Sequence, residues 1–297
     1  MSGHTKKNLV VWHLLSNPWN SAITEYAIST IRSFEHLGGK NILTLRENTV
    51  AHKRAKKENL KVTTVLSFSF FELKKLRDLQ KKINPDFIFL YGGKETFLAR
   101  FLSFKKASFI RLRGYKLKKN FFDFLFPLAH THLHSLLSPG IELQKDLQKK
   151  LVRKKVYKLT LGCDDKVFSC LKTSWLSHRQ VRKHLRPRIL ILGRLDPVKG
   201  HREFLKIFSR VLENWSYLDL EKPYLMIIGK EENLSYKDLK DFIKAETKLT
   251  LGRDVLFRDQ YFEKPELVQA LQETSLGVVP SLWSEEICRV TQEFLLC

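Results

Sequence analysis

The sequence has no apolar stretch approaching the ~20 residues that a helix needs to cross a bilayer. The first apolar run, residues 9–15, follows Lys6 and Lys7 as the core of a signal peptide would. It is only seven residues long, contains His13 and is not followed by a small-residue cleavage site. We therefore expect a first β-strand here and a protein that stays in the cytoplasm.

Cysteine is also scarce, which argues against a disulfide framework or a zinc-binding domain. The four cysteines are Cys163, Cys170, Cys288 and Cys297, and they form neither a CxxC pair nor a zinc-ligand spacing. The alternating histidines from His130 to His134 have no acidic or cysteine partner at matching spacing. We expect reduced structural thiols, no metal site and no bound cofactor.

Acidic residues are too few to balance the charge, and the imbalance lies in one half of the chain. The net charge is +22. Residues 1–172 hold 33 Lys and Arg against 13 Asp and Glu, whereas residues 173–297 hold 20 against 18. This asymmetry predicts an anionic partner for the first half, either a lipid headgroup layer or nucleic acid. A solvated basic surface that serves solubility is the alternative, and no nucleic-acid-binding motif is present.

Short apolar runs alternate with helical patterns along the whole chain, which is typical of βαβ units. We expect an α/β protein with two tandem Rossmann-like domains and a ligand cleft at the carboxyl ends of the strands. The first, basic domain is assigned to residues 1–172. A polar linker is assigned to residues 173–186 and a second domain to residues 187–297.

The first chemical motif is Ile191-Leu-Gly-Arg-Leu-Asp-Pro-Val-Lys-Gly200. A predicted strand leads into a turn at Gly193, then a loop with Arg194 and Lys199, then a helix start. Two cations beside a helix N-terminus form a good binding site for phosphate, although structural Arg and Lys in such a loop are common.

The second motif is Pro280-Ser-Leu-Trp-Ser-Glu-Glu-Ile-Cys-Arg-Val-Thr-Gln-Glu293, which follows a predicted strand and opens a helix expected over 285–296. Glu285 and Glu293 are a little over two helical turns apart, so both carboxylates are expected near one helix face. Such carboxylates can accept hydrogen bonds from sugar or ribose hydroxyls. An acidic helix start favoured by the helix dipole is the structural alternative.

Together, these motifs resemble glycosyltransferase family 4, the group 1 enzymes of GT-B type, which carry G-R-L-x-x-x-K-G followed by P-S-x-x-E-x7-E. Two earlier segments, Pro85-Asp86-Phe-Ile-Phe and Leu161-Gly162-Cys163-Asp164, are also similar to the family. The resemblance implies a metal-independent, retaining, hexosyl-type transferase acting on a nucleotide sugar such as a UDP- or GDP-sugar.

The resemblance also implies roles for individual residues. Gly193, Arg194 and Lys199 would hold the donor diphosphate, with the two cations stabilising the leaving group. Glu293 would bind the ribose, and Glu285 would contact the sugar near its anomeric centre. Backbone amides of Glu286, Ile287 and Cys288 would assist at the helix N-terminus.

The chain departs from the family pattern in two places. Around Glu285 the family has E-G-F-G, whereas this chain has Glu285-Glu286-Ile287-Cys288, so the loop loses two glycines. The family also continues beyond the position of Cys297 with two more strands and a helix. We therefore expect a C-terminally truncated second domain that lacks its last strands, and an inactive remnant with a binding or scaffolding role is the alternative to an active enzyme.

Residues for the acceptor are expected in the first domain. Asn17, Trp19 and Asn20 lie in the loop after the first strand, and Arg113 follows a later strand. The predicted function is transfer of a sugar from a nucleotide-sugar donor to a glycan or lipid-linked acceptor in envelope polysaccharide (lipopolysaccharide) synthesis. The basic domain would touch the inner face of the cytoplasmic membrane; a nucleic-acid-binding protein is the remaining alternative.

Overall fold

The computed structural model describes residues 9–19, 21–102, 107–112, 130–160, 162–163, 165, 167–169, 186–215, 221–259, 264–283 and 288–297. The chain forms two compact units, Met1–Leu161 and Gly162–Cys297. Of the linker predicted at 173–186, residues 173–185 lie outside the described residues. The domain boundaries predicted from the sequence therefore stay a prediction.

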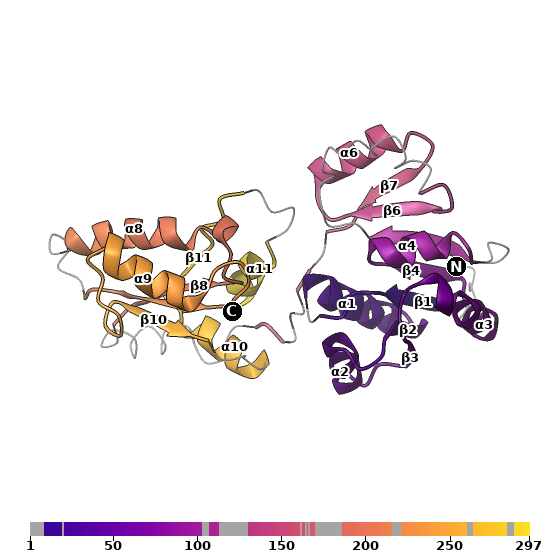
Figure 1. Ribbon diagram of the computed structural model, residues 1–297, viewed down its shortest axis with the longest axis horizontal. Coiled ribbons are helices and arrows are strands. Elements are labelled where there is room, and N and C mark those ends of the chain that lie inside the picture. The colour runs from indigo at the N-terminus through magenta and orange to yellow at the C-terminus, as the bar shows by residue number, and fades with distance from the viewer. Residues whose placement is uncertain are drawn as a thin grey trace, which may run out of the picture. The chain divides into compact units, whose positions relative to one another are not determined.

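The first unit is built on one parallel sheet (Figure 1). Its elements are β1 (Val10–Leu15), α1 (Ala22–His36), β2 (Lys40–Arg46), α2 (Val50–Lys57), β3 (Val62–Val65), the 3-10 turn η1 (Phe70–Glu72), α3 (Leu73–Ile83), β4 (Phe87–Leu90), α4 (Gly93–Ala99), β5 (Ser108–Leu112), β6 (Ser135–Ser138), α6 (Ile141–Lys150) and β7 (Lys155–Lys158). The strand order is β3-β2-β1-β4-β5-β6-β7. The order reverses between β1 and β4, and ligands bind at such a switch point in doubly wound folds.

Helices cover both faces of this sheet, which explains why its central strands β1 and β4 are apolar at nearly every position. Trp12 and Leu14 of β1 belong to a core that includes Leu76 of α3 and Leu98 of α4. On the other face, His13 lies in edge-to-face contact with Phe34 of α1. The alternation along β1 thus sends successive side chains to opposite layers.

The second unit repeats this architecture with a four-stranded parallel sheet in the order β10-β9-β8-β11 (Figure 1). Its elements are β8 (Arg188–Leu192), η3 (Pro197–Lys199), α8 (His201–Glu213), β9 (Tyr224–Ile228), α9 (Tyr236–Glu246), β10 (Val255–Arg258), α10 (Lys264–Gln272), β11 (Leu276–Val278) and α11 (Arg289–Leu296). Each unit thus has the strand order of a Rossmann-like sheet, with the switch point of the second between β8 and β11.

The two faces of the second sheet are packed by different helices. Ile189 and Ile191 of β8 join the core formed with Leu205 of α8 and Leu239 of α9. Leu190 instead packs with residues of α10 and with the end of α11. The predicted α/β class with two tandem Rossmann-like sheets is therefore confirmed. No helix in the described ranges is long and apolar enough to span a membrane.

Candidate functional site

The two sequence motifs meet at the switch point of the second sheet. The first motif follows β8 and the second follows β11, and these strands pair in parallel with Leu276 opposite Ile189 and Val278 opposite Ile191. Parallel pairing brings both carboxyl ends to the same edge of the sheet. Segments about eighty residues apart in sequence therefore become neighbours because of the strand order.

The first motif is folded by Asp196. Its carboxylate accepts hydrogen bonds from the Val198 amide at 3.0 Å and from Asn233 Nδ2 at 2.8 Å, so it caps η3 and ties the loop to the segment after β9. Burial acts to raise the pKa of Asp196, but these hydrogen bonds, with nearby positive charge, outweigh it and the pKa lies below its ordinary value. The loop is held by an ionised, buried carboxylate.

The cations of this motif lie at the surface of the loop. Arg194 is exposed, with half of its side-chain area accessible, and Lys199 ends η3 just before α8. Arg194 donates a hydrogen bond to Glu232 and lies 3.9 Å from the Asp196 carboxylate. Two cations beside the N-terminus of α8 can bind a diphosphate, and Glu232 competes with such a ligand for Arg194.

Direct backbone contacts join the two motifs. The Leu282 amide donates to the Val198 carbonyl at 2.9 Å. Gly200, at φ +69°, lies so near the second motif that a Cβ on it would come within 2.1 Å of the Pro280 carbonyl oxygen. Only glycine combines this left-handed conformation with this close approach. The spacing of the motifs in sequence does not reveal this contact.

A second close approach shapes the same edge of the sheet. A Cβ on Gly229, just after β9, would lie 1.8 Å from the carbonyl oxygen of Gly193, and the Gly193 amide donates to the Ile228 carbonyl at 2.9 Å. The predicted donor residue Gly193 is thus packed against the β9 loop. Gly229, Glu232 and Asn233 were absent from the sequence prediction, and a glycine at the end of a buried strand was the only signal for them.

Glu293 lies on α11, and its side chain is almost fully buried. Arg289 Nε, one helical turn earlier, contacts Glu293 Oε1 at 2.9 Å. A buried, paired carboxylate has a fixed orientation, as a ribose-binding group requires. α11 is anchored by Phe294, whose ring would overlap a Cβ on Gly277 of β11.

The remaining donor residues are only partly placed. Glu285, Glu286 and Ile287 lie outside the described residues, and Cys288 precedes α11 as its N-cap. The described helix begins at Arg289, later than the helix predicted over 285–296. The relation of Glu285 to Glu293 and the roles of the backbone amides stay predictions.

The acceptor loop predicted in the first unit lies at the switch point of its sheet. Asn17 Nδ2 donates to the Trp19 carbonyl at 2.9 Å and to Ser21 Oγ at 2.7 Å, so its amide group shapes this loop. Trp19 is 61% exposed. Glu95, in the first turn of α4, accepts a hydrogen bond from the Ser16 amide at 3.2 Å. Asn20 and Arg113 lie outside the described residues.

Beneath this loop, the first sheet contains a buried polar network around His13. Its ring nitrogens lie 2.9 Å from the Tyr91 hydroxyl and 3.0 Å from Asn41 Oδ1. Because Asn41 Nδ2 donates to the Ile31 carbonyl, its Oδ1 is the acceptor, which assigns the proton to His13 Nε2. Burial lowers the pKa of His13 to about 4, so the ring is neutral at physiological pH.

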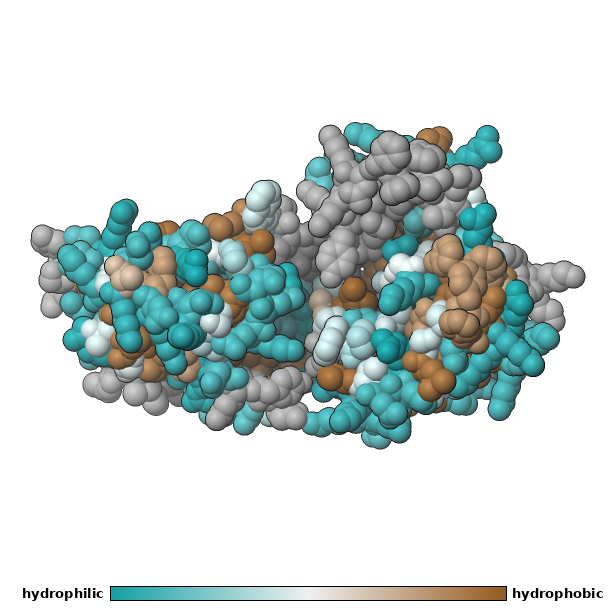
Figure 2. Space-filling view, viewed as in Figure 1, coloured by the Kyte–Doolittle hydropathy of each residue, from teal (hydrophilic) through white to brown (hydrophobic). Residues whose placement is uncertain are grey.

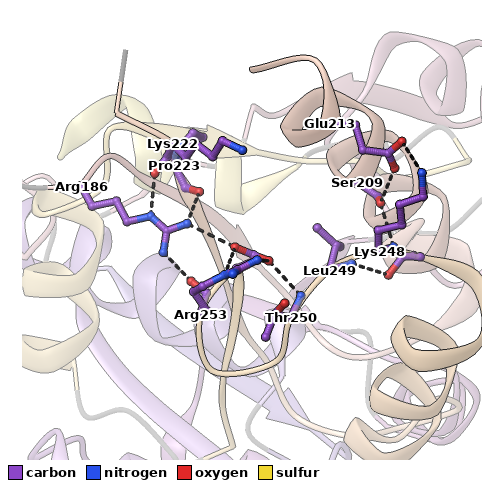
Figure 3. A network of polar contacts seen from close by, with 11 residues as sticks. Arg186, Ser209, Glu213, Lys222, Pro223, Lys248, Leu249, Thr250 and Arg253 are labelled. Carbon is purple, nitrogen blue, oxygen red and sulfur yellow. Dashed lines mark hydrogen bonds and ion pairs between the residues drawn. The ribbon is translucent and has the colours of Figure 1, made fainter. Parts of the chain in front are cut away.

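A pocket of about 450 Å³ lies at the opposite, amino edge of the second sheet. Arg186, on its wall, donates to the carbonyls of Lys222, Pro223 and Arg253 (Figure 3). Asp254 accepts from Arg253 and from the Thr250 amide. These groups bind one another and the backbone, so this network is structural and far from the carboxyl edge that carries the motifs.

Comparisons with known proteins agree with this geometry. Residues 175–297 match the family described as glycosyl transferases group 1. No curated protein matches the chain by sequence. Among solved structures, the Anabaena protein HepE, crystallised with UDP and glucose, has a TM-score of 0.72 at 14% identity and covers 97% of this chain and 78% of its own.

Two other solved structures show the same fold. A Rickettsia africae glycosyltransferase has a TM-score of 0.75 at 14% identity and covers 97% of this chain and 76% of its own. Sucrose-phosphate synthase from Thermosynechococcus elongatus has a TM-score of 0.67 at 12% identity, covering 96% and 78%. The chain has the GT-B fold of these structures, and its residues 175–297 are similar to the group 1 glycosyl transferases.

Proposed function

We propose that this protein transfers a sugar from a nucleoside diphosphate sugar, bound at the carboxyl edge of the second sheet, to an acceptor at the first unit. The observation that carries the proposal is the meeting of the two motifs at the switch point, through the Leu282–Val198 hydrogen bond and the close approach of Gly200 to Pro280. This arrangement brings the basic loop and the helix that carries Glu293 to one edge of one sheet.

Each described group has a role that suits its surroundings. Arg194 and Lys199 bind the diphosphate and stabilise the negative charge that grows on it as the sugar leaves. Glu293 accepts hydrogen bonds from the ribose hydroxyls with its carboxylate oriented by Arg289. Glu285 would contact the transferred sugar, assisted by the amides of Glu286, Ile287 and Cys288.

The finer assignments rest on the family resemblance and on the solved structures. HepE is crystallised with UDP-glucose, and a trehalose-6-phosphate synthase of similar fold is described as transferring sugar with retention. These relatives support a hexosyl donor such as UDP-glucose and retention of anomeric configuration here. Asn17, Trp19, Asn20 and Arg113 are proposed to contact the acceptor or sugar.

We infer that the acceptor is a glycan or lipid-linked saccharide of the cell envelope and that the protein acts at the inner face of the cytoplasmic membrane. The support is the charge of residues 1–172, which hold 33 basic against 13 acidic residues. A surface of this charge attracts an anionic lipid layer.

The test is a titration of UDP-, GDP- and ADP-glucose into the full chain while its thermal unfolding is followed. One of these donors should raise the unfolding temperature of the wild type, because a ligand that binds only the folded state stabilises it. In Lys199→Ala the affinity for this donor should fall about tenfold or more, since a charge-assisted contact to phosphate is lost. Lys244→Ala, in the last turn of α9, is the matched control and should leave the affinity unchanged.

Stabilisation by none of the three donors would refute the proposal for this chain. Equal weakening in Lys199→Ala and Lys244→Ala would contradict the proposed role of Lys199 in the donor site.

A further inference from the structure

Four phenylalanines form an exposed cluster on the first unit, here called the phenylalanine cluster. Phe70 and Phe71 belong to η1, whereas Phe97 and Phe101 belong to α4 and the turn after it. Their exposed fractions are 54%, 98%, 51% and 37%. In Figure 2 a broad brown area with hydrophilic residues around it covers the part of this unit where α4 and β4 lie in Figure 1.

Three of the four rings, those of Phe70, Phe97 and Phe101, hold one another in place. The centroid of Phe70 lies 5.1 Å from that of Phe101 and 5.7 Å from that of Phe97, and the Phe97–Phe101 distance is 5.8 Å. All three pairs are edge-to-face, the arrangement that aromatic quadrupoles favour. The cluster is therefore a preformed apolar protrusion rather than a set of scattered surface residues, and contiguous patches of this kind mark interaction sites.

Basic side chains border the cluster. α3 begins directly after η1 and carries five basic residues and one acidic residue. A surface groove of about 440 Å³ runs from Phe71 along α3, and its charged lining consists of Lys74, Lys75 and Lys82 with Glu72 and Asp78. Arg77, on the same helix, donates a hydrogen bond from its Nε to the Phe101 carbonyl at 3.0 Å. The apolar protrusion thus lies next to a helix of net positive charge.

We propose that the phenylalanine cluster and the basic face of α3 form a docking surface for an anionic lipid bilayer. The rings enter the boundary between headgroups and acyl chains, and the α3 lysines bind lipid phosphates. This combination provides two sources of affinity, apolar burial and charge, which membrane attachment generally requires.

The geometry favours a bilayer over single-stranded nucleic acid as the partner. A nucleic-acid platform presents open ring faces on which bases stack. Here Phe70, Phe97 and Phe101 are packed edge-to-face against one another. Phe71 is almost fully exposed, and transfer of this large apolar surface from water into lipid is favourable.

This inference deepens the proposed membrane contact and rests on it, but it is independent of the donor site. The test is flotation of the full chain with vesicles of phosphatidylcholine alone and vesicles in which half of the lipid is phosphatidylglycerol. The wild type should float with the anionic vesicles, less so at high salt. Phe71→Ser and Phe97→Ser should each lower the partition coefficient about tenfold.

Charge reversal tests the basic border. Lys74→Glu combined with Lys75→Glu should abolish the preference for anionic vesicles. Val152→Ser, at a site 80% exposed in the same unit, is the control for the phenylalanine changes. Lys145→Glu combined with Lys149→Glu on α6 changes the net charge equally and is the control for the lysine changes.

Three results would overturn the inference: no flotation of the wild type, equal losses in the cluster variants and their controls, or loss of RNA binding in these variants without vesicle binding. Thermal stabilisation by a nucleotide sugar, measured on the same samples, reports the donor site separately. A chain that binds the sugar nucleotide but not vesicles therefore refutes only the docking surface.

Discussion

Gly200 joins the two motifs of the proposed donor site, and its replacement by alanine has two physical effects. The first is backbone strain, since a Cβ at φ +69° costs about 1–2 kcal/mol. The second is steric, because that Cβ would lie 2.1 Å from the Pro280 carbonyl oxygen, whereas ordinary contacts begin at 3.4 Å. The Pro280 segment must move by more than 1 Å, and overpacking of this kind costs roughly 1–3 kcal/mol.

Gly252 provides a matched control in the same unit. It has φ +81°, and a Cβ on it would meet no atom within 4 Å beyond its chain neighbours. Gly252→Ala therefore introduces the strain without the clash and should cost about 1–2 kcal/mol. Gly200→Ala should cost roughly 2–5 kcal/mol, the sum of the strain and the overpacking.

The assay is urea unfolding of the full chain, with the second unit followed by the hydrogen-exchange protection of β8. Calorimetric titration with UDP-glucose is run on the same variants. Gly200→Ala should weaken binding about tenfold or more, because the shift misplaces the second motif. Gly252→Ala should bind as the wild type does. Equal losses of stability in both variants, or unchanged binding in Gly200→Ala, would refute this reasoning.

Three further predictions follow from charged and polar groups. Glu232→Gln removes the charged partner of Arg194 and should tighten binding of a nucleoside diphosphate up to about fivefold, because the exposed pair is worth at most about 1 kcal/mol. Calorimetric titration measures this change, and unchanged or weaker binding would contradict the prediction. His13 has a pKa lowered to about 4 in the folded state, so between pH 7.5 and 5 the unfolded state binds more protons than the folded state. Over this range the free energy of unfolding, measured with urea, should fall by about 2 kcal/mol more in the wild type than in His13→Gln. The same fall in both proteins would contradict this prediction. Asp254→Asn should cost the second unit about 1–3 kcal/mol in urea unfolding and leave UDP binding intact; altered binding would place the amino-edge pocket in the donor site.

Much of the fold could be predicted because its strands are short, strongly apolar and separated by clear breakers. β1 (Val10–Leu15), for example, coincides with the apolar run at residues 9–15 for which a strand was expected. Three helices of the described residues have a weaker signal in the sequence. α2 buries only Ala51, His52 and Ala55, and α6 buries only Leu143 and Leu147. Neither sequence carries the wide apolar stripe from which an amphipathic helix can be predicted. α4 is a short helix that begins with a glycine.

The candidate site could be predicted as two motifs but not as one surface. Arg194 and Glu293 were recognisable because they lie at strand-to-loop and helix positions typical of a family. The contact between Val198 and Leu282 depends on the register of β8 with β11. That register is a long-range property and has no local signal. The Arg194–Glu232 pair could not be predicted from the sequence for the same reason, because its two residues follow different strands.

The central claim is that both motifs bind one nucleotide-sugar donor. Hydrogen–deuterium exchange of the full chain, with and without UDP-glucose or the donor that stabilises it most, tests this directly. We predict slower exchange both in residues 193–200 and in residues 280–297, with no change at residues 248–254 on the amino edge. Protection of only one motif, or of the amino edge alone, would contradict the account.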